Sequence, residues 1–207
     1  VKDLLKVVFL TDYKVSLAER IMPACDLSEQ ISTAGTEASG TGNMKFALNG
    51  ALTIGTYDGA NIEISEEVGE DNIFIFGLRE NEVISLRESG YNPWDYYNKV
   101  PMINEVMNFL QEELIAKENR DLMQPLIHTL LDGGDYYLVF ADFEAYVKKQ
   151  REVAELYADH KEWLKKSILN SARMGKFSSD RTIDEYAREI WNVKPVEINP
   201  QEIGSPE

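Results

Sequence analysis

The sequence has little cysteine, little histidine and a deficit of positive charge. Among its 207 residues there is one cysteine, Cys25, and there are two histidines. A single cysteine excludes an intrachain disulfide and a metal site built from several cysteines. It is also typical of a reducing compartment, so we expect a cytoplasmic protein. Lys and Arg number 21 against 36 Asp and Glu, which gives a formal net charge of −15. This surplus of negative charge repels nucleic-acid phosphates and anionic lipid headgroups, so we expect neither nucleic-acid nor membrane binding.

Long apolar runs are absent as well. Nowhere do about 18 consecutive apolar residues occur, as a membrane-spanning helix requires, and the first ten residues lack the features of a signal peptide. Hydrophobic residues nonetheless make up 43% of the chain and aromatic residues 10%, a composition typical of a globular protein. Residues 6–10 are typical of a buried strand with almost nothing before it, so we expect a fragment of a longer protein.

The first ~80 residues alternate between predicted strands and predicted helices. Strands are expected at residues 7–10, 52–54 and 72–77, and helices at 16–21 and 43–48. Ser16 and Glu19 have the spacing of a capping box at the start of the first helix. This alternation predicts an α/β fold with a parallel sheet and helical crossovers.

Helical periodicity dominates the second half of the chain. Helices are expected near residues 101–114, 142–157, 163–175 and 180–191, with Asp142 as an N-cap, and one more strand at 137–140. Residues 195–207 contain three prolines and no periodicity, so we expect an irregular tail there. With no internal repeat and no convincing linker, residues 1–194 are expected to form one partial domain.

A glycine-rich loop at residues 35–42 is the feature most typical of a ligand site. Its three glycines lead directly into the predicted helix at 43–48. Glycine is kept where a backbone approaches a ligand, and N–H groups from Thr41 onward at a helix start favour a phosphate or another anion. The spacing matches neither the P-loop nor the dinucleotide fingerprint. The glycines alone favour a second interpretation, a tight connection beside a solvated lysine.

Lys45 is the best candidate nucleophile. The positive end of a helix dipole favours the neutral amine that reacts with an aldehyde cofactor, although a surface lysine is the alternative. Glu37, Asp58 and Glu63 are acids in the same region that could act as an acid and base pair or hold a metal. Residues 58–61 are more simply explained as a turn with a helix cap, and we expect no metal site.

Residues 37–49, EASGTGNMKFALN, resemble the pyridoxal-phosphate attachment signature of the α-glucan (glycogen, starch or maltodextrin) phosphorylases. The resemblance continues through residues 10–32 and 50–61 and returns at 140–142 and 175–191, so it covers nearly the whole chain except the tail. It implies the later part of the carboxyl-terminal, Rossmann-like catalytic and cofactor domain of a two-domain glycosyltransferase of the GT-B type, helix-rich in its second half.

The same resemblance implies an enzyme. Family members use inorganic phosphate to release terminal α-1,4-linked glucose from a glucan as glucose 1-phosphate, with retention of configuration. Their cofactor is pyridoxal 5′-phosphate, whose own phosphate assists proton transfer, and Lys45 matches the lysine that holds it as an aldimine. The resemblance also implies that the full-length parent forms a homodimer.

Further site residues are implied by matching family positions. The residues that match cofactor contacts are Thr41, Gly42, Tyr13 and Lys14, the last of which stands where many members have arginine. Those that match contacts to the glucose hydroxyls are Glu37, Ser39 and Gly40. Glu37 and Lys45 are the residues expected to matter most for catalysis.

Two other functions remain open at this point. One is a non-catalytic module that binds an anion or a sugar. The other is a pyridoxal enzyme acting on amino acids, which needs an arginine for the substrate carboxylate and an acid for the pyridine nitrogen; nothing flanking Lys45 suggests either. Because the cationic residues that bind substrate phosphate in the family would lie outside this sequence, the fragment alone is expected to be inactive.

Overall fold

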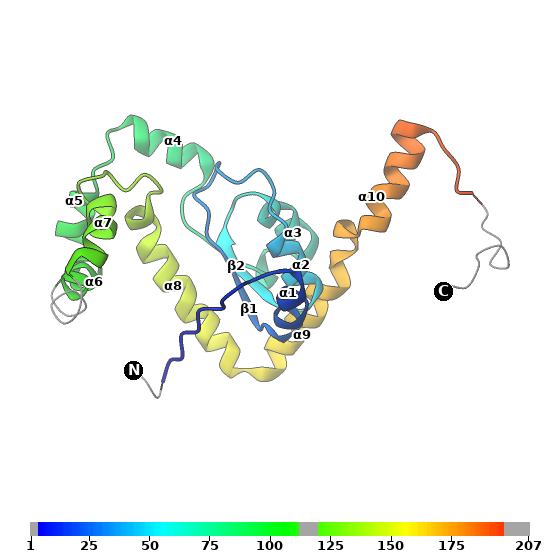
Figure 1. Ribbon diagram of the computed structural model, residues 1–207, viewed down its shortest axis with the longest axis horizontal. Helices are drawn as coiled ribbons and strands as arrows, with labels where there is room; N and C mark the ends of the chain where they lie inside the picture. The colour runs from blue at the N-terminus through cyan, green and yellow to red at the C-terminus, as the bar shows by residue number, and fades with distance from the viewer. Residues whose placement is uncertain (1–3, 112–119, 197–207) are drawn as a thin grey trace.

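The computed structural model describes residues 4–111 and 120–196, and within them a parallel sheet is surrounded by helices (Figure 1). The strands are β1 (Leu27–Gln30), β2 (Leu52–Thr56) and β3 (Phe74–Phe76), in the order β1-β2-β3. Gln30 pairs with Gly55, and Thr56 pairs with Phe76, so all three strands end at one edge of the sheet. This arrangement confirms the α/β class with a parallel sheet.

Helices form most of the remaining described chain. They are α1 (Val15–Ile21), η1 (Met22–Ala24), α2 (Gly42–Leu48), α3 (Ala60–Val68), η2 (Glu70–Asn72), α4 (Glu80–Glu88), α5 (Pro93–Lys99), α6 (Pro101–Phe109), α7 (Arg120–Leu130), α8 (Val139–Ala158), α9 (His160–Arg173), η4 (Met174–Phe177), α10 (Ser179–Glu185) and the π-helical η5 (Tyr186–Trp191). None of the described helices has both the length and the apolar character that crossing a bilayer requires. The helix-rich second half is confirmed over the described residues.

The sheet is covered by helices on both faces. On one face, Leu52 and Ile54 of β2 pack against Val153 of α8 and Trp163 of α9. A second buried cluster joins α2, α3 and η4 to the residue that precedes β3; its members are Ala47, Ile64, Val68, Ile73 and Met174. Burying each large apolar side chain contributes about 1.5–3 kcal/mol, so these two clusters hold the sheet between its helices.

Helices α5, α6 and α7 form a third cluster beside the start of α8 (Figure 1). Its buried residues are Val100, Ile103, Met107, Ile127, Leu131 and Phe140. Ile103 and Met107 lie one turn apart on α6, as the predicted helical periodicity required. The predicted continuation of this helix to residue 114 lies outside the described residues.

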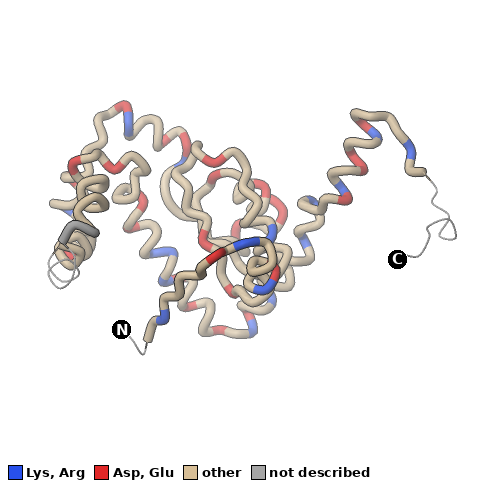
Figure 2. Tube along the Cα trace, viewed as in Figure 1, with Lys and Arg blue, Asp and Glu red and all other residues tan. Residues whose placement is uncertain are grey.

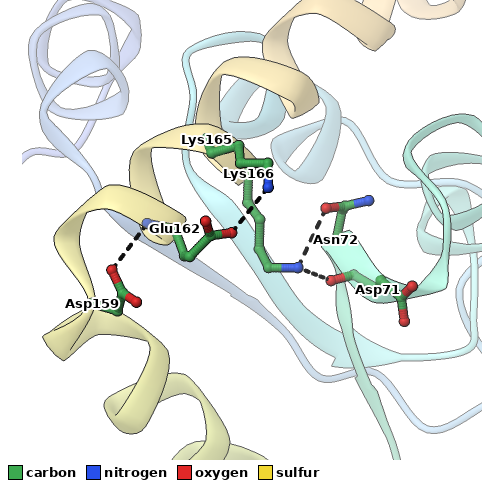
Figure 3. A network of polar contacts seen from close by, with 6 residues as sticks. All are labelled: Asp71, Asn72, Asp159, Glu162, Lys165 and Lys166. Carbon is green, nitrogen blue, oxygen red and sulfur yellow. Dashed lines mark hydrogen bonds and ion pairs between the residues drawn. The ribbon is translucent and has the colours of Figure 1, made fainter.

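Polar contacts fix α9 to the turn before β3 (Figure 3). The Lys166 ammonium donates to the carbonyl oxygen of Asp71 and, at 3.4 Å, to Oδ1 of Asn72. At the start of α9, the Asp159 carboxylate accepts the N–H of Glu162 at 3.2 Å, an N-cap interaction. The predicted helix at 163–175 is therefore confirmed, with a start three residues earlier than its apolar pattern suggests.

Residues 6–10 do not form the predicted strand, and that prediction was wrong. Val7, Val8 and Phe9 are 85%, 58% and 89% exposed. An apolar run becomes a strand only when a neighbour completes its ladder, and within the described residues no strand pairs with the outer edge of β1. Strand β1, in contrast, was not predicted, because Leu27–Gln30 has one large apolar residue and gives no hydrophobic pattern.

The start of α8 also differs from the prediction. Residues 137–140 are not a strand, because α8 begins at Val139 and Leu138 has φ of +56°. The Asp135 carboxylate accepts the N–H groups of Val139 at 3.0 Å and Phe140 at 2.9 Å, which fixes the helix start there. Asp142 is therefore not the N-cap; it lies inside the first turn of α8.

The start of α1 is one residue earlier than predicted. The N-cap is Lys14, and no side chain caps the helix, so the predicted capping box of Ser16 and Glu19 was wrong. A capping box requires its serine outside the helix, whereas Ser16 is the second residue inside it. The helix itself and its end at residue 21 are confirmed, and Pro23 lies in the following η1.

Candidate functional site

The glycine-rich loop leaves the carboxyl edge of the sheet and runs into α2, as predicted. It follows Gln30, the last residue of β1, and ends at Thr41, the N-cap of α2. Gly35 and Gly40 both have φ of +86°, a left-handed conformation that residues with a Cβ rarely adopt. Ligands of open α/β sheets bind outside the carboxyl ends of the strands. The loop therefore lies at the edge where a site is expected.

The residues predicted to bind sugar lie together in this loop. Glu37 and Ser39 are exposed, and Gly40 is half-buried. The Ser39 N–H donates to Oε1 of Glu37 at 3.4 Å, and the Ser39 hydroxyl donates to the carbonyl oxygen of Gly40 at 3.3 Å. The structure thus gathers all three in one short, accessible stretch of chain.

Lys45 lies in the middle of α2 with an exposed side chain. This helix has seven residues and begins at Gly42, one residue before the predicted start. The N–H of Lys45 already donates to the carbonyl oxygen of Thr41 at 3.2 Å, so Lys45 lies past the unbonded N–H groups of the helix start. The dipole of so short a helix does not explain a reactive lysine. What singles Lys45 out is an exposed amine one turn from the loop.

Tyr13 and Lys14 lie at the start of α1, away from the loop in sequence. Tyr13 is exposed, and the exposed Lys14 ammonium donates to Oδ2 of Asp12 at 2.7 Å. In the ranges that the structure describes, no hydrogen bond joins Tyr13 or Lys14 to residues 35–45. Helix α1 continues into η1, which packs against α2. The structure therefore brings the end of α1 near α2, whereas Tyr13 and Lys14 lie at the opposite end of α1.

The start of α2 offers hydrogen-bond donors to a ligand. No acceptor among the described residues takes the N–H groups of Thr41, Gly42 or Asn43. One turn later, Lys45 adds an exposed primary amine. Unbonded N–H groups suit a phosphate, and an accessible amine suits an aldehyde. This donor set fits pyridoxal phosphate, which carries both groups.

Asp58 lies in the predicted turn, where its carbonyl oxygen accepts the N–H of Asn61 at 3.1 Å, and its side chain organises the loop. The N-cap of α3 is Gly59, and it makes no side-chain cap. Oδ1 of Asp58 accepts the N–H of Gly35 at 2.9 Å, and Oδ2 accepts the N–H of Glu37 at 3.0 Å and the hydroxyl of Ser32 at 2.7 Å. Asp58 is 5% exposed. No sequence signal reveals this role, because the donors lie 21 to 26 residues earlier in the chain.

The residues after Asp58 touch the loop as well. The N–H of Ala60 donates to the carbonyl oxygen of Ser39 at 2.6 Å. A Cβ at Gly59 would lie 2.6 Å from that same oxygen and 2.9 Å from Cγ of Glu37. Only glycine fits this approach, so the Asp-Gly pair serves the loop as much as it serves the turn.

Two of the hollows in the described structure border the loop. One, of about 570 Å³, is lined by Asp58 and by four glutamates, Glu37, Glu63, Glu66 and Glu80. No acidic, histidine or cysteine side chains among the described residues are grouped so as to hold a metal ion. The other, of about 410 Å³, has hydroxyl groups that already donate to protein oxygens; they belong to Ser32, Thr33, Thr36 and Thr56. The first hollow is therefore acidic, and the second is mainly apolar.

Comparisons with known proteins identify the family to which the chain belongs. A carbohydrate phosphorylase family model matches residues 1–193. The glycogen phosphorylase of Synechocystis sp. is 56% identical over 201 residues, which are 97% of this chain and 24% of that protein. The muscle forms of glycogen phosphorylase from Mus musculus and Homo sapiens are each 54% identical over 195 residues, 94% of this chain and 23% of each relative. The chain thus spans about a quarter of the length of these relatives, and it belongs to the carbohydrate phosphorylase family.

Proposed function

We propose that this chain is the carboxyl-terminal part of an α-glucan phosphorylase. The whole enzyme would transfer terminal α-1,4-linked glucose from a glucan to inorganic phosphate and release glucose 1-phosphate. The observation that supports this most is the stretch from Glu37 to Lys45, which combines an exposed carboxylate, unbonded N–H groups and an exposed amine in a chain of this family. The curated relatives named above are glycogen phosphorylases, which favours glycogen as the glucan.

The proposed whole has two Rossmann-like domains of the GT-B arrangement. Residues 1–194 would form the later part of the second domain, with 195–207 as a tail. Three parallel strands with helices on both faces are compatible with this part of such a domain. A cytoplasmic homodimer is the state we propose for the full-length protein.

Pyridoxal phosphate is the cofactor we propose, held covalently by Nζ of Lys45. The N–H of Gly42 and the hydroxyl of Thr41 would bind its phosphate, since they lie at the start of α2, where Thr41 is exposed and Gly42 half-buried. Tyr13 and Lys14 would lie against it once the rest of the protein is present. When bound, the cofactor supplies a phosphate group that helps substrate phosphate protonate the glycosidic oxygen.

The loop supplies the sugar contacts in this proposal. The Glu37 carboxylate has two oxygens that can accept hydrogen bonds from glucose hydroxyls, and Ser39 and the backbone of Gly40 complete the set. Contacts that strengthen as the sugar approaches the transition state raise turnover rather than ground-state affinity alone. A loop with a fixed backbone is suited to this, because it need not reorganise during the reaction.

The first test is the Lys45→Ala substitution in a full-length phosphorylase that carries this sequence. We expect it to lose the cofactor and at least about 10³-fold of phosphorolysis, because both the attachment and the phosphate position depend on Lys45. Mass spectrometry after borohydride treatment should find pyridoxyl phosphate on the peptide that contains Lys45 in the unsubstituted protein. The matched control is Lys165→Ala, a 71% exposed lysine of α9 outside the site.

Equal effects of Lys45→Ala and Lys165→Ala would contradict the assignment. An unlabelled Lys45 peptide from a folded, full-length protein would do the same. Either result would return residues 41–45 to an anion-binding start of a helix and favour a non-catalytic module.

A further inference from the structure

Between Gly35 and Ser39, the backbone of the sugar-binding loop is held by the turn at residues 58–61. Asp58 accepts the N–H groups of Gly35 and Glu37 at 2.9 and 3.0 Å. Ala60 donates to the carbonyl oxygen of Ser39 at 2.6 Å. These three bonds span the part of the loop that contains Glu37, and each joins residues about 20 positions apart. The loop geometry therefore depends on the turn.

The same turn is also connected to the helix that carries Lys45. Oδ1 of Asn61 accepts from Nδ2 of Asn43 at 3.1 Å, and Nδ2 of Asn61 donates to the carbonyl oxygen of Thr56 at 3.0 Å. Asn43 and Asn61 are 3% and 2% exposed. The turn thus links the loop, the end of β2 and the start of α2 through buried hydrogen bonds.

The residue that supports the loop is buried, whereas the loop residues that it supports are exposed. Asp58 is 5% exposed, whereas Glu37 and Ser39 are exposed. Within the loop itself, the N–H of Thr36 donates to the carbonyl oxygen of Thr33 at 3.0 Å. Without the turn, the segment around Glu37 would have little to hold it in one conformation.

We propose that Asp58 is a positioning residue that fixes the backbone of Glu37 and so sets the place of the Glu37 carboxylate against the transferred sugar. This inference rests on the proposed function. Asp58 does not contact the sugar in this scheme; it acts through Glu37. Its two carboxylate oxygens accept three hydrogen bonds, and hydrogen bonds to an ionised acceptor are stronger than neutral ones.

The Asp58→Asn substitution tests the proposal because it keeps the size and removes one acceptor. The amide nitrogen of asparagine is a donor, so the N–H of Gly35 or of Glu37 loses its partner and faces another donor. In the full-length protein we expect kcat for glucose 1-phosphate to fall by about 10- to 100-fold, as misplacement of a catalytic group by about 1 Å does. Cofactor content should stay at the level of the unsubstituted protein.

The matched control is Asp135→Asn. Asp135 is 1% exposed and accepts the same kinds of donor, two backbone N–H groups and one hydroxyl, from Val139, Phe140 and Tyr91. Its own hydrogen bonds fix the start of α8 and do not reach residues 35–40. We expect it to lower the melting temperature by an amount similar to Asp58→Asn while kcat stays within about twofold. Equal kcat values for the two variants would overturn the proposal.

A double-mutant cycle with Glu37→Gln distinguishes positioning from a general loss of structure. If Asp58 acts through Glu37, adding Asp58→Asn to Glu37→Gln should change kcat by no more than about threefold, because the contact it positions is already weakened. The effect should fall on kcat more than on KM, since the contact strengthens in the transition state. Losses that multiply in the double variant would overturn the proposal.

A milder variant covers the case in which Asp58→Asn does not fold. Ser32→Ala removes one of the three donors to Asp58, and we expect a fall in kcat of about two- to fivefold that disappears in the Glu37→Gln background. An unchanged kcat would overturn the proposal. Lys45→Ala, measured in parallel, distinguishes failure of the proposed function from failure of the positioning role alone. If Lys45→Ala keeps cofactor and turnover, the proposed function fails, and the positioning role fails with it. If Lys45→Ala behaves as expected and Asp58→Asn resembles Asp135→Asn, only the positioning role fails.

Discussion

Asp142 has a buried carboxylate whose negative charge is stabilised by few of the described groups around it. It lies in the first turn of α8 at 8% exposure, where its Oδ1 accepts the N–H of Leu78 at 2.8 Å. Burial raises the pKa of the Asp142 carboxyl, the bond from Leu78 opposes this shift, and the nearby acids Asp135 and Glu82 raise the pKa further. A raised pKa means that the folded state binds a proton more tightly than the unfolded chain does.

The pH dependence of stability follows from that sign. Below the pKa of the unfolded chain, both states are protonated and the contribution of Asp142 is fully present; it is lost as pH rises through the raised pKa of the folded state. We therefore expect Asp142→Asn, which cannot ionise, to become more stable relative to the unsubstituted protein between pH 4 and 7. Each unit of pKa difference corresponds to about 1.4 kcal/mol. Urea unfolding at a series of pH values measures this, and a difference that is flat or declines with pH would contradict it.

Single residues of the site were predictable where they are contiguous in sequence. Glu37, Ser39 and Lys45 belong to one unbroken motif, and their order in the loop and in α2 follows from it; their roles stay predictions. Asp58 was not predictable, because its role consists of bonds to donors 21 to 26 residues away. Asp135 was missed for a related reason, since its capping of α8 depends on the local turn around Leu138.

Helix α2 ends in a left-handed turn whose geometry requires glycine. Gly50 has φ of +90°, its N–H donates to the carbonyl oxygen of Ala47 at 3.1 Å, and the N–H of Ala51 donates to that of Phe46 at 3.1 Å. These two bonds are those of a Schellman motif. Ser167 of α9 donates its hydroxyl to the carbonyl oxygen of Gly50 at 2.7 Å, so the turn also connects two helices.

The Gly50→Ala substitution should lower the free energy of unfolding by more than the backbone strain of a positive φ alone accounts for. A Cβ at Gly50 would lie 2.9 Å from Oγ of Ser167, whereas at Gly90, with a similar φ of +87°, it would meet nothing within 4 Å. We expect Gly90→Ala to lower the free energy of unfolding by about 1 kcal/mol from backbone strain and Gly50→Ala by about 2–3 kcal/mol. Chemical denaturation of both variants measures the difference. Equal losses would show that Ser167 moves aside at no cost.

Elements were predicted well where periodicity and end signals coincide. Helix α2, with Gly50 after its end, and strand β2 show both, and both are confirmed. Strand β1 was missed because one apolar residue in four gives no alternation, and pairing with β2 specifies it instead. Residues 6–10 had the apolar pattern of a strand without a partner within the described chain. Sequence pattern reports the preference of a segment, whereas a strand also needs its neighbour.

Acidic residues are distributed along the whole described chain and are not confined to one segment (Figure 2). The acidic residues behind the net charge of −15 are therefore spread along the chain, and some of them line the hollow that includes Glu37. Such a field opposes the binding of a phosphate dianion. The cation nearest to the loop in sequence is Lys45, and Nζ of Lys176 lies 3.9 Å from Oε2 of Glu66 in the hollow.

The isolated 207-residue chain should consequently show no phosphorolysis. Substrate phosphate needs cationic partners to approach Glu37 and Lys45, and in this chain the neighbouring hollow carries four glutamates instead. We expect millimolar inorganic phosphate to shift the melting temperature of the isolated chain by less than about 1 °C, because a ligand stabilises only in proportion to its binding to the folded state. The full-length protein, which supplies the rest of the cleft in our proposal, should be stabilised and active under the same conditions. Phosphate-dependent release of glucose 1-phosphate by the isolated chain would contradict this and would place the whole phosphate site within these residues.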